Sequence, residues 1–159
     1  MEIINGERLV LGTCYYPEHW DESLWRDDLR RMLENGIEVI RIAEFAWSKI
    51  ERYEGVFNYD FFDRFLDVAA DMGMKVIFCT PTATPPAWLT EKYPEVLNAN
   101  MDGVLYRHGG RRHYNYNSPK YQELTRIIVE KSASHYAKHP AIIGWQIDNE
   151  INCEKNEFY

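Results

Sequence analysis

The chain has 159 residues, of which 45% are hydrophobic and 14% aromatic, and this composition is typical of a protein with one ordinary folded core. Lys and Arg number 18 against 25 Asp and Glu, which gives a net charge of −7 at pH 7. An acidic surface disfavours nucleic acid and anionic membranes as partners, and no apolar stretch of the sequence reaches membrane-spanning length.

The elements are predicted in chain order. Residues 1–8 lack the basic start and apolar run of a signal peptide, so we expect a cytoplasmic protein. A first strand is predicted at residues 9–16, followed by a loop. Asp21 is expected to cap a helix that runs to Leu33 with its apolar positions on one face, and Gly36 closes this helix.

Strands and helices then alternate to the end of the chain. Apolar runs predict strands, amphipathic stretches predict helices, and glycine or proline marks several boundaries. The expected elements are a strand at 37–42, an aromatic loop at 43–48, a helix from Asn58 or Asp60 to Gly73, a strand at 75–80, a long loop to Ser118 with a short helical turn at 86–89, a helix from Pro119 to about Tyr136, and a strand at 141–147.

This order predicts a parallel sheet with helical crossovers, either an open doubly wound sheet or a barrel. No glycine-rich phosphate loop follows the first strand, and three of the four strands end in charged or amide groups with aromatic residues nearby. These features favour an α/β fold of the (β/α)8 TIM-barrel type. Because a complete barrel takes about 250 residues, we expect residues 1–159 to be the N-terminal part of a barrel domain. They would form about its first four βα units, with no internal domain boundary.

The last predicted strand leads into Asp148, Asn149 and Glu150. Catalytic groups of a barrel collect at the carboxyl edge of its strands, where a carboxyl group can protonate a leaving oxygen and an amide can bind a sugar hydroxyl. We interpret Glu150 as a general acid and base and Asn149 as a substrate ligand; the alternatives are a helix-capping glutamate and a turn-forming asparagine. Asp148 is disfavoured as a catalytic group, because in an extended segment its side chain points to the face opposite Asn149.

Two further positions carry charges near predicted strand ends. Arg41 and Glu44 end the second strand, and an inward Arg41 needs partners, so it orients the acid, holds a sugar hydroxyl or forms a structural ion pair. Arg111 and Arg112 lie in the long loop after the third strand, on the face where loops are usually functional. One of the two is expected to reach the site and the other to be a surface charge, and spacing alone does not say which.

Aromatic and sulfur-containing side chains give weaker indications. Cys14 and Cys79 lie in strand-like runs and are expected to be small buried apolar groups. His108, His113 and Cys153 do not have the spacing of a ligand set, so we expect no metal and no cofactor. Four rim residues are equally expected to stack on a sugar or to pack in the core: His19, Trp20, Trp47 and Trp88.

Five segments of the chain resemble motifs of glycoside hydrolase family 42, the β-galactosidases of the retaining barrel clan. The segments run in the same order over nearly the whole chain, and together they are highly specific. They are residues 14–20 (CYYPEHW), 41–47 (RIAEFAW), 80–86 (TPTATPP), 109–114 (GGRRHY) and 145–150 (WQIDNE).

The resemblance implies a role for each matching residue. Glu150 would be the acid/base, Asn149 and Arg111 would bind substrate, and Arg41 and Glu44 would line the sugar site. The implied activity is that of a retaining β-galactosidase that removes terminal non-reducing β-D-galactosyl residues by double displacement. The family's nucleophile is a second glutamate at the end of strand seven, beyond the C-terminus of this chain, so the chain alone is expected to be inactive.

The resemblance also bears on partners and metals. The family often forms trimers, so a homotrimer is the expectation for the full-length protein. Some members bind a structural zinc through four cysteines, but Asn115 stands here at the position of one of them, so zinc is not expected. Two alternatives to β-galactosidase activity stay open: another barrel glycosidase acting on β-glucosides, β-mannosides or arabinosides, and a non-catalytic sugar-binding fragment.

Overall fold

The computed structural model describes residues 9–110, 112–151 and 157–158. The chain forms two compact units whose segments alternate along the sequence. The first unit comprises Met1–Ala43, Tyr59–Cys79 and Tyr136–Gln146, and the second comprises Glu44–Asn58, Thr80–His135 and Ile147–Tyr159.

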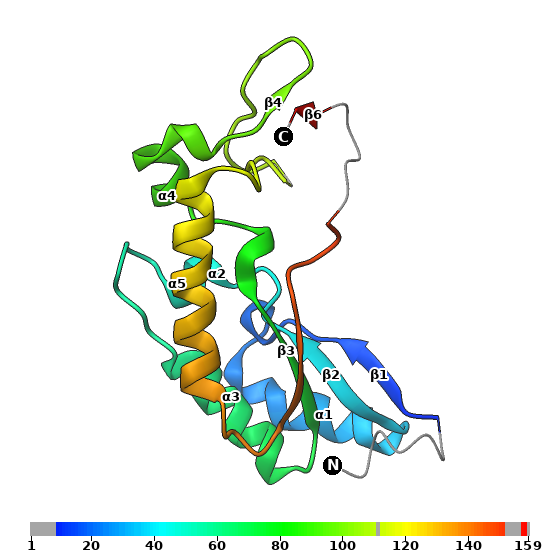
Figure 1. The fold of residues 1–159 in the computed structure, drawn as a ribbon. Helices are drawn as coiled ribbons and strands as arrows, with labels where there is room; N and C mark the ends of the chain where they lie inside the picture. Colours follow the sequence, from blue (N-terminus) through cyan, green and yellow to red (C-terminus); the bar gives the residue numbers. More distant parts are fainter. Residues whose placement is uncertain (1–8, 111, 152–156, 159) are drawn as a thin grey trace. The chain divides into compact units, whose positions relative to one another are not determined.

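The first unit is built on a parallel sheet. Among the described residues the strand order is β1-β2-β3-β5, with β1 at Leu11–Cys14, β2 at Ile37–Ile42, β3 at Lys75–Cys79 and β5 at Ile142–Gln146 (Figure 1). Every neighbouring pair of these strands is parallel, and their order in space follows their order in sequence. This arrangement is the one that the repeating strand–helix units of a (β/α)8 barrel produce.

Two helices pack on this sheet. Helix α1 (Trp25–Glu34) contacts β2, helix α3 (Asp60–Asp71) contacts β3, and the two helices contact each other (Figure 1). Their amphipathic spacing buries Trp25, Phe62 and Phe65, and the rings of Trp25 and Phe65 meet edge to face at 5.1 Å. The apolar face that the sequence predicts for each helix is therefore the face that is buried.

The two faces of the sheet differ in burial. Ile42 on β2 is the register partner of Phe78 on β3, both are fully buried, and Phe78 meets Phe62 of α3 at 5.8 Å. Side chains alternate along a strand, so Arg41 and its register partner Ile77 lie on the opposite face, where both are half-buried. The face away from α1 and α3 is thus the one that carries the polar side chain.

The second unit consists of short elements and one long helix. Its elements are α2 (Trp47–Ile50), η4 (Pro81–Ala83), α4 (Ala87–Lys92), η5 (Pro94–Val96), β4 (Ala99–Asn100), β6 (Glu157–Phe158) and α5 (Pro119–Tyr136), whose last residue belongs to the first unit. Strands β4 and β6 pair antiparallel. The core of this unit is aromatic: Tyr114 and Tyr121 stack at 4.7 Å, and Trp47 is fully buried.

The predicted elements are present with changed ends. The first strand is shorter than the predicted 9–16, because Pro17 begins the 3-10 turn η2 (Pro17–His19). The helix after Asp21 starts as the 3-10 turn η3 (Glu22–Leu24), and Asp21 accepts a hydrogen bond from the Ser23 N–H at 2.9 Å, as its predicted capping role requires. The predicted turn at 86–89 is the longer helix α4, and α2, β4 and β6 were not predicted.

The prediction for the cysteines is half right. Cys79 is fully buried, as expected, but Cys14 is exposed. The difference arises because Cys14 lies on β1, which is an edge strand of the described sheet. All four residues of β1 are exposed. Within the described ranges, no helix is long and apolar enough to cross a membrane.

Candidate active site

Each segment of the second unit begins at the carboxyl end of a strand. Along the chain, Glu44 comes two residues after the end of β2, Thr80 directly follows β3, and Ile147 directly follows β5. Barrel enzymes carry their catalytic groups at these strand ends. The polar side chains near these junctions are therefore the candidate functional residues of each unit.

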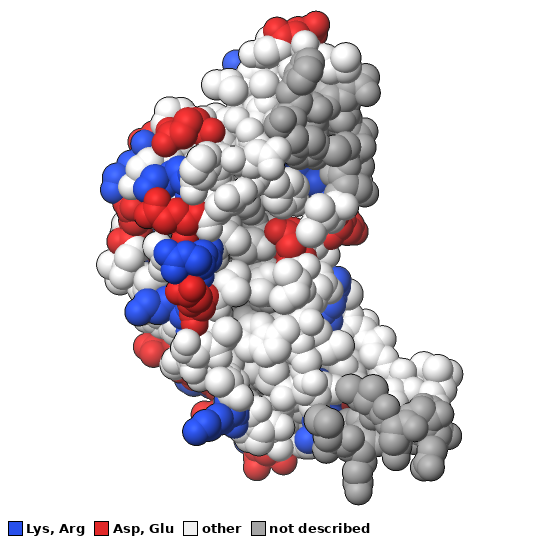
Figure 2. Space-filling view, viewed as in Figure 1, with Lys and Arg blue, Asp and Glu red and all other residues white. Residues whose placement is uncertain are grey.

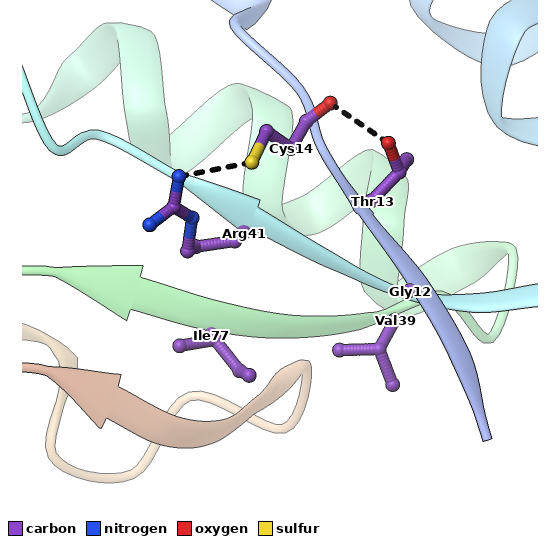
Figure 3. Close-up of a pocket in the computed structure, with 6 residues that line it drawn as sticks. All are labelled: Gly12, Thr13, Cys14, Val39, Arg41 and Ile77. Carbon is purple, nitrogen blue, oxygen red and sulfur yellow. Dashed lines mark hydrogen bonds between the residues drawn. The ribbon is translucent and has the colours of Figure 1, made fainter. Parts of the chain in front are cut away.

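Arg41 links three strands of the first unit. Its Nη1 donates a hydrogen bond to Gln146 Oε1 on β5 at 2.5 Å, and its Nη2 donates to the Cys14 sulfur on β1 at 2.9 Å. The guanidinium is thus held by an amide and a thiol. Arg41 and Cys14 line a pocket of about 240 Å³ (Figure 3). The residues that line this pocket are Gly12, Thr13, Cys14, Val39, Arg41 and Ile77.

Glu150 forms an ion pair with Arg112 in the second unit. The Arg112 Nη2 lies 3.1 Å from Glu150 Oε2, and the side chains are 6% and 53% exposed, respectively. The buried guanidinium orients one carboxylate oxygen while much of the Glu150 side chain stays accessible. A carboxyl group in this setting can exchange a proton with a bound molecule.

Asp148 is the centre of a buried hydrogen-bond network in the second unit. Its Oδ2 accepts from the Thr82 hydroxyl at 2.7 Å, and its Oδ1 accepts from the Asn149 N–H at 2.6 Å. Its own N–H donates to Thr80 Oγ1 at 2.7 Å. The Thr82 carbonyl in turn accepts from the Tyr121 hydroxyl at 2.7 Å, so the network reaches helix α5.

An unusual backbone conformation recurs at these residues. Among the described residues, only four that are not glycine have a positive φ: Ala43 at 70°, Arg112 at 57°, Asp148 at 55° and Glu150 at 52°. Such conformations cost free energy and persist where the surroundings impose them, often at functional sites. Ala43 directly precedes Glu44, and Arg112 and Glu150 form the ion pair. Asp148 lies two residues after the end of β5.

The tyrosines near Asp148 are strongly perturbed. Burial raises the pKa of Tyr121 and of Tyr114 well above the usual value, and the charge of Asp148 adds to both shifts. Burial also raises the pKa of Tyr116, again with a contribution from Asp148. These phenols therefore stay protonated at neutral pH and act as hydrogen-bond donors and packing groups around the Asp148 carboxylate.

Comparison with known proteins identifies the family. The sequence-family model of glycoside hydrolase family 42, whose description is beta-galactosidase, matches residues 14–159 of this chain. The chain belongs to glycoside hydrolase family 42. The five segments that resemble family motifs therefore indicated the correct family.

Family 42 relatives match this chain over nearly its whole length. Beta-galactosidase BgaA of Thermus sp is 46% identical over 144 residues, which are 91% of this chain and 22% of the relative. Beta-galactosidase Bga of Halorubrum lacusprofundi is 43% identical over 145 residues, which are 91% of this chain and 21% of the relative. The chain thus spans about a fifth of the length of these family 42 relatives.

Solved structures of family 42 proteins establish the fold. The crystal structure of beta-galactosidase from the psychrophilic Marinomonas ef1 matches with a TM-score of 0.89 and 42% identity, over 93% of this chain and 23% of that chain. The described strands and helices correspond to about the first four βα units of the (β/α)8 barrel of family 42, as the sequence predicts.

The structure places the predicted family 42 site residues as follows. Asn149 and Glu44 are buried, with 6% and 2% of their surface exposed, and both belong to the second unit with Glu150. Arg41 belongs to the first unit. Arg111 lies outside the described residues, so the structure gives no account of it.

Sequence reasoning missed two parts of the site. It left open which arginine reaches the site, and of the pair only Arg112 is described; it is buried against Glu150. It also treated residues 148–149 as extended, which is wrong because Asp148 has a left-handed backbone; the argument that placed Asp148 on the face opposite Asn149 therefore loses its basis. The signal that could have indicated this is the residue type, since Asp tolerates that conformation and bonds to nearby backbone.

The four rim aromatic residues have different surroundings. Trp47 is fully buried, and its Nε1 donates to Glu51 Oε2 at 2.7 Å. Trp88 is half-buried, and its Nε1 donates to the Glu51 carbonyl at 3.0 Å. His19 stacks on Tyr16 at 5.1 Å, whereas Trp20 is 54% exposed and lines a second pocket of the first unit. Among these four residues, Trp20 and His19 are exposed, and Trp20 lines a pocket.

The expectation that zinc is absent stays a prediction, because Cys153 lies outside the described residues. Within the described ranges, no group of three or more His, Cys, Asp and Glu side chains could hold a metal ion. Asn115, which stands at the position of one zinc-binding cysteine, instead accepts a hydrogen bond from the Asn117 N–H at 2.8 Å.

Proposed function

We propose that the full-length protein is a retaining β-galactosidase and that this chain supplies its acid/base, Glu150. The observation that carries the proposal is the place of Asn149 and Glu150, directly beyond the carboxyl end of β5 in a chain of family 42. Catalytic residues of barrel enzymes lie at such ends. The half-exposed carboxylate of Glu150 is accessible to a leaving oxygen.

The proposed reaction is a double displacement. A second glutamate, beyond this chain, attacks the anomeric carbon while Glu150 gives its proton to the departing glycosidic oxygen. In the second step the ionised Glu150 removes a proton from water, and the resulting hydroxide oxygen displaces the enzyme carboxylate. The two carboxyl groups of a retaining pair lie about 5–5.5 Å apart.

Arg112 has a defined place in this cycle. A guanidinium binds a carboxylate more strongly than a neutral carboxylic acid. The contact of Arg112 with Glu150 would therefore favour the ionised form, which is the form that acts as a base in the second step. Transfer of the proton from water to Glu150 would release the pair and restore the acid.

The remaining site residues are proposed as substrate ligands. The Asn149 amide would bind a sugar hydroxyl next to the scissile bond, and Arg111 would bind the substrate from the long loop. Arg41 and Glu44 would line the sugar site, with Arg41 held in place by Gln146 and Cys14. Polar groups that are fixed before the substrate arrives lose little entropy on binding.

Several properties of the whole protein belong to the same proposal. Residues 1–159 would be the N-terminal part of one catalytic barrel domain in a cytoplasmic homotrimer. Acidic and basic side chains are interspersed on the face drawn in Figure 2, and ion pairs such as that of Arg126 with Glu130 on α5 join opposite charges. A mixed surface with a net charge of −7 supports a neutral sugar, rather than a nucleic acid, as the partner.

A panel of aryl glycosides tests the proposal in the full-length protein. The β-D-galactoside should be the best substrate, and proton NMR of the first product should show β-galactose before mutarotation, since two displacements retain the configuration. Preference for a β-glucoside, β-mannoside or arabinoside would replace the substrate assignment. First release of α-galactose would exclude a retaining mechanism, and binding of galactose without turnover would indicate a sugar-binding protein.

A further inference from the structure

The backbone at the end of β5 turns at Asp148. This residue is 7% exposed and has φ of 55°, and Glu150, two residues later, has φ of 52°. In an extended strand, side chains alternate between two faces. Left-handed residues break that alternation, so the direction of the Glu150 side chain depends on the conformation at Asp148.

We propose that Asp148 is a positioning residue for Glu150: its carboxylate, held by Thr82 and the Asn149 N–H, fixes the turn that aims the acid/base. The inference rests on the proposed function of Glu150. It extends that function to a residue that does not itself touch the substrate in the proposed reaction.

Three of the hydrogen bonds made by Asp148 contribute to the turn, and each has a separate geometric role. The Asp148 N–H donates to Thr80 Oγ1, which ties the start of the turn to the residue after β3. Asp148 Oδ1 accepts from the Asn149 N–H, which fixes the peptide between Asp148 and Asn149. Asp148 Oδ2 accepts from the Thr82 hydroxyl, which fixes the carboxylate.

The support under Thr82 is rigid. Its carbonyl accepts from the Tyr121 hydroxyl, and the Tyr121 ring stacks on Tyr114 at 4.7 Å with an interplanar angle of 18°. Thr82 and Tyr121 are each 2% exposed. The Asp148 carboxylate is therefore anchored to a packed aromatic group on α5 rather than to a solvent-exposed loop, as a precise catalytic geometry requires.

Loss of the Asp148 carboxylate should mainly slow proton transfer from Glu150 to the leaving group. Without its acceptors, the Asn149 N–H and the Thr82 hydroxyl lose their partners, and the left-handed turn loses the bonds that hold it. A displacement of about 1 Å at a catalytic group can lower a rate by about a hundredfold. A misplaced acid affects substrates with poor leaving groups, whereas an activated aryl galactoside needs little protonation and should be affected less.

The test compares four variants of the full-length protein. Asp148→Ala removes both acceptor oxygens, and Asp148→Asn keeps an acceptor for the Asn149 N–H and a donor toward Thr82 Oγ1, in a residue that also tolerates positive φ. Thr82→Val removes one hydroxyl with little change of shape. Asp102→Asn is the matched control, because Asp102 is an exposed carboxylate in the same unit.

The measured quantity is kcat/KM for lactose, which has a poor leaving group, and for an activated aryl β-galactoside. Asp148→Ala should lose at least about tenfold more on lactose than on the aryl galactoside, Thr82→Val should show a smaller difference in the same direction, and Asp148→Asn should recover most of the lactose activity. Asp102→Asn should match the wild type on both substrates.

Three outcomes would overturn the inference. Equal losses on both substrates in Asp148→Ala would show a structural role only, and failure of Asp148→Asn to recover activity would exclude positioning through hydrogen bonds. If Asp148→Ala does not fold, equal losses in Thr82→Val are decisive. Glu150→Gln separates this result from the proposed function: if that variant also loses equally on both substrates, the acid/base assignment itself is wrong.

Discussion

The ion pair of Arg112 with Glu150 yields a quantitative prediction. Arg112→Gln removes the charge, and Arg112→Lys keeps it. The Glu150 side chain is 53% exposed, so water screens the pair although the Arg112 side chain is 6% exposed. Ion pairs with an exposed partner contribute roughly 0.2–1 kcal/mol of interaction free energy. The upper value corresponds to about a fivefold change in rate.

This effect should fall on the second chemical step. Proton transfer from water to Glu150 releases the ion pair with Arg112, so the pair stabilises the state before this step and opposes the step. Removal of the charge in Arg112→Gln should therefore raise kcat on an activated aryl galactoside, by up to about fivefold. Arg112→Lys should stay within about twofold of the wild type, because the charge is kept.

Salt provides the matching assay. The screening length falls from about 10 Å at 0.1 M salt to about 3 Å at 1 M, which is close to the 3.1 Å that separates Arg112 Nη2 from Glu150 Oε2. The wild-type kcat should therefore rise with salt toward the value of Arg112→Gln, and the variant should respond less. A lower kcat in Arg112→Gln, or equal salt responses of both proteins, would refute a screened ion pair.

Three further predictions concern stability. Phe62→Ala should destabilise the full-length protein by about 3–5 kcal/mol, because Phe62 is fully buried against Phe78; an unchanged half-life of thermal inactivation would contradict this. Gly12→Ala should lower the melting temperature, since an added Cβ would lie 3.0 Å from the Val39 carbonyl oxygen and displace β1; an unchanged melting temperature would argue against that close approach. Burial lowers the pKa of His113 below its usual value of 6.5, so the unfolded chain takes up the proton first as the pH falls. The stability associated with this group is complete above about pH 6.5 and declines below it, so His113→Gln should lose less stability than the wild type on acidification, and parallel losses would contradict the shift.

The strands and helices were predictable because their signals are local. The helix that begins at Asp60 and the strand that ends at Ile42 follow from apolar spacing over a few residues, and their buried faces agree with that spacing. The short helix α2 was missed because its four residues, Trp47–Ile50, are too few for a helical period to show. Cys14 was misjudged because a strand-like run does not reveal whether its strand lies at an edge.

The residues of the candidate site stay a prediction, and their geometry could not be predicted from the sequence. Family motifs indicated Asn149 and Glu150, whereas the left-handed turn at Asp148 depends on Thr80 and Thr82, which lie 68 and 66 positions away in the chain. A rule based on strand periodicity does not contain such contacts. The choice between Arg111 and Arg112 stays a prediction, because Arg111 lies outside the described residues and burial against Glu150 is known only for Arg112.

The central claim is that Glu150 is the acid/base of a retaining β-galactosidase, and a series of aryl β-galactosides with leaving groups of graded pKa tests it most directly. In the full-length protein carrying Glu150→Gln, kcat/KM should fall steeply as the leaving group becomes poorer and should approach the wild-type value for the most activated substrate. A loss of the same size across the whole series would contradict the claim.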